Sequence, residues 1–340
     1  MSPLNDFELH LPQLPTEEEW IKAINELEGR KKEAAIVRAK GYNLLADFQE
    51  PKATFERIGW LNLWAKAMVA LESAMSAFQE GLDWVLQTTS RSTFEWVLHA
   101  YVLIEPIFDL IELEKSEHKV VVSTRSREYS HRITVERLRA YTAWCLWSDK
   151  VFYSNLIHPK TLADVWDPNP AKKILANEKD KEGYERFFGR IEAETNEEEL
   201  NKSRKEMERL YRSKKARIDK WLQDPQLKSW SDRILKLSRK NKGAVSFFNL
   251  FDPDATVSKR LKKLGLRFGY VQYSKSSMSL HGSSMEQFII IGDSVVIPKL
   301  KMANQADETL FETVISDCNH LFVLLGMINH FVLKNEKFRI

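Results

Sequence analysis

Apolar side chains recur at helical spacing along much of this chain, and this pattern constrains the fold more than any other feature. From Phe94 to Leu113 they are almost continuous, which is typical of a helix buried on most sides. Further helices are predicted over 16–38, 55–86, 135–157, 197–221, 230–237 and 309–334. Only 12 Gly and 11 Pro occur in 340 residues, which disfavours a sheet-rich fold with many turns. We therefore predict an all-α protein.

Local signals place some of the element boundaries. Thr16 precedes three glutamates, a pattern typical of an N-cap with an acidic first turn, and Ile21 should lie on the inner face of that helix. The Thr- and Ser-rich run 88–92 predicts the start of the Phe94 helix, and 115–130 reads as an irregular loop. The apolar runs around Gly292-Asp293-Ser294 predict one short β-hairpin at 288–297.

Composition limits the class of protein. A hydrophobic content of 43% with ten Trp and eighteen Phe supports a sizeable core and argues against intrinsic disorder. Cys145 and Cys318 lie in apolar helical patterns, as expected of reduced, buried thiols, and no His/Cys cluster has metal-ligand spacing. We expect no metal or other cofactor. The N-terminus lacks an apolar signal region, and the apolar stretch Leu321–Leu333 is too short to span a bilayer, so we expect a cytoplasmic protein without a membrane segment.

Positive charge is concentrated in one part of the chain. The formal net charge is +3, but 233–275 holds eleven Lys and Arg against two Asp, or +9. This concentration indicates an anionic partner such as a nucleic acid, although a solvated helix face would have the same composition. The predicted anion-binding residues are Lys259, Arg260, Lys262, Lys263 and Arg267. The polar helix at 197–222 carries both signs of charge and is a candidate surface for a partner protein.

A polar stripe near the C-terminus is the first candidate site. If its segment is helical, Ser277 and His281 share one face with Tyr273 beside it, and Gly282 predicts that the helix ends directly after the histidine. An imidazole at an exposed helix end is a plausible acid–base group. Such a histidine is also a common way to end a helix.

A second candidate lies on the apolar helix that begins near Phe94. Arg91 and Glu95 are four residues apart, so they share a face and can form an ion pair, with His99 roughly nearby. The pair could be structural and tie helices together, because a charge in a buried helix needs a partner. Alternatively, Arg91 is aimed at a phosphate and Glu95 orients it or a histidine.

These two motifs, in this order, resemble a bacterial family of helical domains similar to abortive-infection proteins of the AbiV type and to HEPN domains. The resemblance covers 55–335, with 1–54 as an N-terminal helical extension and 115–225 as a long, charged helical insertion. It implies a HEPN-like bundle that acts as a metal-independent endoribonuclease, a toxin or antiviral defence effector that works as a homodimer.

The resemblance also implies roles for individual residues. His281 would be the general base or acid in RNA cleavage, Arg91 and Lys275 would stabilise the phosphorane, and Ser277 would orient the histidine or bind phosphate. HEPN ribonucleases use an arginine where this chain has Lys275, and Lys lacks the bidentate fork of Arg. The literal spacing occurs only at 125–131, Arg125 to His131, which we interpret as a chance match.

Three hypotheses follow from the sequence. The first is the HEPN-like ribonuclease. The second is a non-catalytic helical module that binds nucleic acid or a partner protein through the basic 233–275 region, and the third is a helical scaffold in which the His281 stripe only ends a helix. The ribonuclease requires His281 and the Arg91–Glu95 pair to meet in a solvent-accessible cleft, because catalytic groups must reach one reacting centre.

Overall fold

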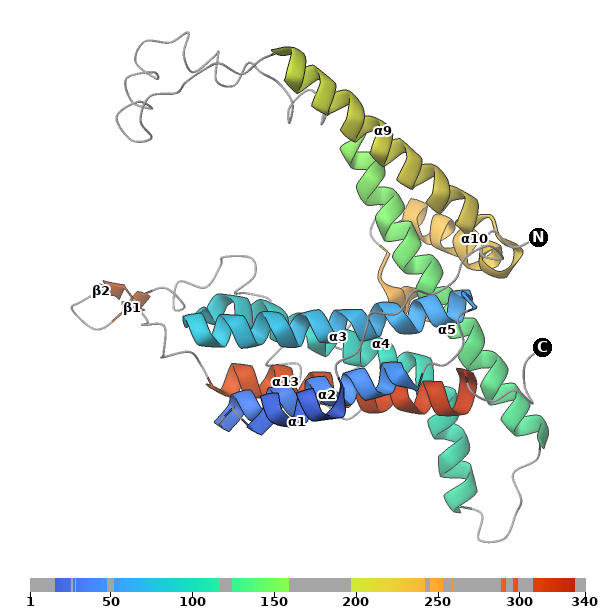
Figure 1. Cartoon of the computed structure of the whole chain (residues 1–340). Coiled ribbons are helices and arrows are strands. Elements are labelled where there is room, and N and C mark those ends of the chain that lie inside the picture. Colours follow the sequence, from blue (N-terminus) through green and yellow to red (C-terminus); the bar gives the residue numbers. More distant parts are fainter. Residues whose placement is uncertain are drawn as a thin grey trace. The chain divides into compact units, whose positions relative to one another are not determined.

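The computed structural model describes residues 16–25, 27, 29–47, 52–116, 124–158, 197–241, 245–252, 259, 289–291, 296–298 and 308–333. Helices dominate these residues, so the predicted all-α class is confirmed (Figure 1). The longer helices are α2 (Gly29–Ala46), α3 (Phe55–Glu80), α4 (Asp83–Ser116), α5 (Thr124–Leu156), α9 (Glu197–Leu222), α10 (Pro225–Lys240) and α13 (Glu308–Ile328). The chain divides into two compact units, one comprising 1–3 and 143–236, the other 4–142 and 237–340.

The larger unit is a helical bundle centred on α13. This helix packs against α4, α3 and α2, and α3 also packs against α2 and α4 (Figure 1). Large side chains from all of these helices are fully buried between them, among them Leu45, Trp60, Leu63, Leu71, Leu103, Ile104, Phe311 and Leu321. Burial of this apolar surface is the main term that stabilises the bundle.

Two tryptophans tie the bundle helices together through their indole groups. Trp60 donates from Nε1 to the carbonyl of Leu325 over 2.9 Å, and Trp64 donates to the carbonyl of Gly41 over 2.8 Å. A buried indole N–H needs an acceptor, and helix carbonyls supply one here. Gly41 also lets α2 and α3 lie close together, because a Cβ at that position would lie 2.7 Å from the sulfur of Met68 on α3.

The boundary between α3 and α4 differs from the predicted one. We expected a single helix over 55–86 and a new start at 88–92, but α3 ends at Gly81, whose φ of 69° is the left-handed conformation that commonly follows a helix. The hydroxyls of Thr88 and Ser92 instead bond to carbonyls four residues earlier, inside α4. Hydroxyl side chains satisfied in this way are compatible with a helix interior, so the sequence signal was misread.

The N-terminal segment also forms two helices where one was predicted. Thr16 and Glu19 form the reciprocal contacts of a capping box, with the Thr16 hydroxyl 3.3 Å from the Glu19 amide, which confirms the predicted start. The first helix, α1 (Glu17–Asn25), ends before Gly29, which has a φ of 54° and begins α2. Ile21 is 53% exposed, so its predicted place on the inner face is wrong.

The smaller unit contains the end of α5, α9 and most of α10. Lys150 of α5 pairs with Asp219 of α9 over 2.6 Å. Asp224 lies between α9 and α10 and accepts a hydrogen bond from the Gln226 amide over 2.9 Å, as an N-terminal cap does. Its buried apolar residues include Leu146, Ile218, Leu222, Leu227 and Ile234. The helix predicted over 197–221 is confirmed as α9.

The remaining elements are short. The 3₁₀ helix η1 (Phe247–Leu250) contacts α4, and the π helix η3 (Asn329–Leu333) continues α13. Two short strands, β1 (Ile289–Ile291) and β2 (Val296–Pro298), pair antiparallel. The residues between the strands lie outside the described chain, so the hairpin at 288–297 stays a prediction. The limits of the predicted insertion at 115–225 and of the 1–54 extension also stay predictions.

One described stretch, Glu308–Leu333, has the length and apolar character of a membrane-crossing helix. Half of its most apolar window is buried within the structure, and core helices of soluble proteins share these properties. Cys318 in this stretch is buried, as predicted, whereas Cys145 is only half-buried.

Candidate functional site

The Arg91–Glu95 pair lies in the first half of α4. Arg91 Nε is 3.7 Å from Glu95 Oε1, so the predicted ion pair is confirmed. The Arg91 side chain is 18% exposed and that of Glu95 is 33% exposed. The two side chains are therefore partly buried and partly exposed to solvent.

The other half of the predicted catalytic cluster lies outside the described residues. This holds for Tyr273, Lys275, Ser277 and His281, and for four of the five predicted anion-binding residues, Arg260, Lys262, Lys263 and Arg267. The fifth, Lys259, is described and exposed. Whether His281 approaches Arg91 thus stays a prediction.

His99, four residues beyond Glu95, lies in an aromatic environment. Its ring centroid is 5.0 Å from that of Phe248, 5.2 Å from Phe247 and 5.8 Å from Tyr141. Burial, together with the nearby positive charge of Lys66, lowers the pKa of His99 to about 3. The imidazole is therefore neutral near pH 7, and its surroundings suit a packing residue that joins α4, α5 and η1.

His131, the histidine of the chance match, lies on α5 beside the end of the α13–η3 segment. Its Nε2 atom is 3.3 Å from the carbonyl oxygen of Val332, within hydrogen-bonding distance. Burial lowers the pKa of His131. This contact fixes α5 against η3, which is a structural role.

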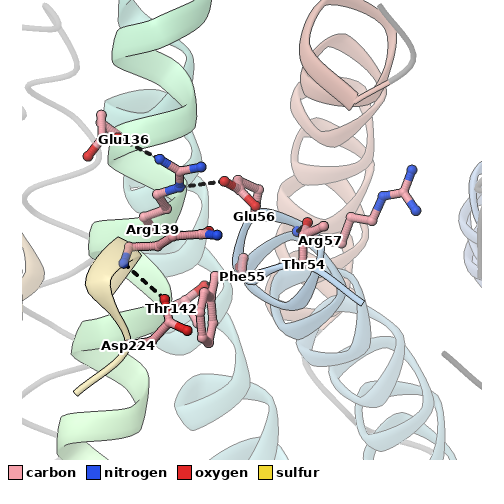
Figure 2. Close-up of polar contacts among 9 residues, drawn as sticks. Thr54, Phe55, Glu56, Arg57, Glu136, Arg139, Thr142 and Asp224 are labelled. Carbon is pink, nitrogen blue, oxygen red and sulfur yellow. Dashed lines mark hydrogen bonds and ion pairs between the residues drawn. The ribbon is translucent and has the colours of Figure 1, made fainter. Parts of the chain in front are cut away.

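A network of charged groups between α3 and α5 was not found from the sequence (Figure 2). Arg139 of α5 donates from Nε to Glu56 of α3 over 2.5 Å and from Nη1 to Glu136 over 2.8 Å. Glu56 is nearly buried, with a side chain 10% exposed, whereas Glu136 is 37% exposed. Figure 2 shows Arg57 pointing away from this network. The Glu56–Arg139–Glu136 network joins the start of α3 to α5, which indicates a structural role.

A second missed group is a carboxyl between α4 and α13. The Thr93 hydroxyl lies 3.2 Å from Asp317 Oδ2 and 3.0 Å from the Ser90 carbonyl. Burial raises the pKa of Asp317 to about 7, and the Thr93 hydrogen bond offsets only part of this effect. The carboxyl changes its charge near neutral pH inside a helix interface.

The smaller unit carries a large excess of positive charge along α9 and α10. Residues 201–236 hold twelve Lys and Arg against five Asp and Glu, a formal net charge of +7. Three of the twelve, Arg212, Lys215 and Lys228, pair with carboxylates within α9 or α10. The other nine, here called the α9–α10 basic surface, form no ion pair with a described side chain: Lys202, Arg204, Lys205, Arg209, Lys214, Arg217, Lys220, Arg233 and Lys236.

The predicted basic region at 233–275 includes only two of these nine bases, Arg233 and Lys236. The sequence of α9 was interpreted as a helix of mixed charge. Of its six carboxylates, three lie in the first turn, at 197–199, and Glu208 and Asp219 pair with neighbouring bases, so that only Glu206 is left to oppose the remaining bases. A count of the charges of α9 beyond its first turn would have revealed this excess of bases.

Among the described residues no group of three or more His, Cys, Asp or Glu side chains could hold a metal ion. The chain matches no protein-family model, no curated protein and no solved structure.

Proposed function

We propose that the protein binds nucleic acid through the α9–α10 basic surface. The observation that carries this proposal is the set of nine Lys and Arg that no described carboxylate neutralises. Seven of the nine are exposed, and only Arg204 and Lys214 are half-buried. Cations held along two helices attract a polyanion, and each phosphate that they neutralise releases a counterion.

Positive charge continues along the chain beyond this surface. The last turn of α10 carries Arg239 and Lys240, and exposed Lys259 follows. We propose Arg260, Lys262, Lys263 and Arg267 as a separate anion-binding segment, on their composition alone. A protein with an acidic surface is the alternative partner, and the experiment below separates the two.

Binding to a fluorescently labelled RNA and DNA should be measured at several salt concentrations. We expect affinity to fall steeply with salt, and Lys202→Glu/Lys205→Glu/Arg209→Glu to flatten the slope of log K against log salt by roughly two to three. A matched control reverses three bases of the larger unit, Lys32→Glu/Lys52→Glu/Arg132→Glu, and should bind like the wild type. Absence of binding at low salt would exclude nucleic acid as the partner.

A second proposal is that the larger unit is HEPN-like and cleaves RNA without a metal. The Arg91–Glu95 pair favours it, because a partly accessible arginine on a bundle helix can stabilise a phosphorane. His281 would transfer the proton, with Lys275, Ser277 and Tyr273 beside it and a second copy of the chain completing a homodimer.

The ribonuclease proposal is tested by expression toxicity and by RNA cleavage in the presence of a chelator. His281→Ala should abolish both, whereas His320→Ala, which changes an exposed histidine on α13, should leave both unchanged. Full cleavage by the His281→Ala protein would rule out this role. Sedimentation or light scattering would measure the proposed homodimer.

A further inference from the structure

Three aromatic rings follow one another across the surface of the smaller unit. The ring centroids of Phe152 and Tyr153, at the end of α5, are 5.4 Å apart at an interplanar angle of 66°. Tyr153 in turn lies 5.8 Å from Tyr211 of α9 at 34°. Phe152 is 56% exposed, and both tyrosines are half-buried. These three rings are here called the aromatic cluster, and Phe152 is its most exposed member.

The aromatic cluster lies within the basic surface. Lys214 Nζ is 5.6 Å from the centre of the Tyr153 ring, a cation–π distance. The same pairing of a base with an aromatic ring recurs in this unit, with Arg217 at 5.9 Å from Trp221 and Arg233 at 5.9 Å from Trp230. Partly exposed rings bordered by cations suit a ligand that carries both flat aromatic groups and negative charge.

We propose that the aromatic cluster stacks with unpaired bases, so that the basic surface takes single-stranded nucleic acid in preference to a duplex. This inference rests on the proposed nucleic acid binding. In a duplex the faces of the bases are covered by their neighbours, and protein rings gain nothing from them. In a single strand each base offers a face, and stacking on aromatic side chains beside a basic groove is the usual mode of binding.

A protein partner would suit the exposed apolar residues Val151 and Leu210 nearby. It would not explain why the rings are bordered by bases that lack a carboxylate partner among the described residues. The charge complementarity therefore favours a polyanion with aromatic groups. Single-stranded RNA and single-stranded DNA share this chemistry, and both are included in the test.

The experiment measures the affinity of the full chain for a labelled 20-nucleotide RNA, the DNA of the same sequence and the blunt duplex, all at one salt concentration. We expect both single strands, or one of them, to bind at least about tenfold more tightly than the duplex. Phe152→Ala and Tyr211→Ala should each weaken single-strand binding by about tenfold and leave duplex binding within about twofold. Trp84→Ala, which removes a ring 60% exposed on α4, is the matched control and should change neither.

Tyr211 is half-buried and contributes to packing. If Tyr211→Ala lowers the helical circular dichroism signal, the test rests on Phe152→Ala alone. Equal affinity for single strands and duplex, or an unchanged affinity of the Phe152→Ala protein, would overturn the stacking inference while nucleic acid binding still stood. Loss of all binding at low salt in the wild type would instead remove the proposed function on which the inference rests.

Discussion

Thr93 of α4 donates a hydrogen bond from its hydroxyl to the carboxylate of Asp317 on α13 over 3.2 Å. Thr93 is fully buried, and the two residues lie in the contact between the helices that form the centre of the bundle. Burying a carboxyl in this place costs little free energy when the carboxyl is protonated and considerably more when it is ionised. The pKa of Asp317, raised to about 7 by burial, expresses that difference.

The first prediction concerns the dependence of stability on pH. Because the pKa of Asp317 is higher in the folded than in the unfolded chain, the folded chain binds more protons between about pH 4 and pH 7. The contribution of Asp317 to stability should therefore fall as pH rises through this window. Asp317→Asn should stabilise the protein at pH 8 by roughly 1–3 kcal/mol and have little effect at pH 4.5.

Urea denaturation of the wild type and the variant at both pH values measures this difference. Asp232→Asn, which changes an exposed carboxylate on α10, is the control and should alter stability by less than about 0.5 kcal/mol at either pH. An Asp317→Asn protein that is no more stable than the wild type at pH 8 would show that the carboxyl ionises without penalty.

The second prediction compares the two carboxylates that share Arg139. Glu56 is nearly buried, whereas the side chain of Glu136 is 37% exposed, although both accept hydrogen bonds from the same guanidinium. Removing the buried partner leaves the arginine with only a solvent-screened one. Glu56→Ala should cost roughly 1–3 kcal/mol of unfolding free energy, and Glu136→Ala less than about 1 kcal/mol. Equal losses in chemical denaturation would mean that burial does not decide the strength of this network.

The third prediction concerns two glycines inside helices. A Cβ at Gly59 would lie 2.6 Å from the Thr142 hydroxyl oxygen and 3.2 Å from the Leu138 carbonyl, whereas a Cβ at Gly326 would meet nothing closer than 3.6 Å. Gly59→Ala should therefore separate α3 from α5 and destabilise the protein by about 1–3 kcal/mol. Gly326→Ala should stabilise it by about 0.5–1 kcal/mol, since Ala is the better helix former. Thermal melting of both variants would detect a reversed order.

The helical elements were predictable because their apolar spacing is a local property of the sequence. The boundaries of these helices were less predictable. Thr88 and Ser92 have the composition of a helix start, but their hydroxyls are equally satisfied by carbonyls within α4, and Gly81 provides the actual stop. A Thr- or Ser-rich run therefore marks a boundary only when its side chains cannot bond back into the preceding turn.

The candidate groups differ in the same way. Arg91 and Glu95 were predictable because a spacing of four places them on one helix face. Glu56 and Arg139 are 83 residues apart in sequence, and only the packing of α3 against α5 brings them together. The aromatic cluster likewise joins Phe152 and Tyr153 to Tyr211 across a segment that no periodicity connects. No pattern in the sequence indicates such contacts.

The last prediction tests the Arg91–Glu95 pair against a matched pair on α9. Glu95 and Glu208 are similarly exposed, at 33% and 29%, and each has an arginine four residues away. The α9 pair is closer, at 2.6 Å against 3.7 Å, and has the more favourable order of acid before base. Its arginine, Arg212, is however 61% exposed, whereas Arg91 is only 18% exposed.

If burial of the arginine decides how much stability is lost when its glutamate is removed, Glu95→Ala should lose roughly 1–2 kcal/mol and Glu208→Ala less than about 0.5 kcal/mol. A double-mutant cycle with Arg91→Ala separates the pair energy from lost packing of the arginine stem. The ribonuclease proposal adds a second readout: Glu95→Ala should lower RNA cleavage at least tenfold at a temperature where the variant is fully folded, and Glu208→Ala should not. A folded Glu95→Ala protein with full cleavage would assign the pair to the architecture of the bundle alone.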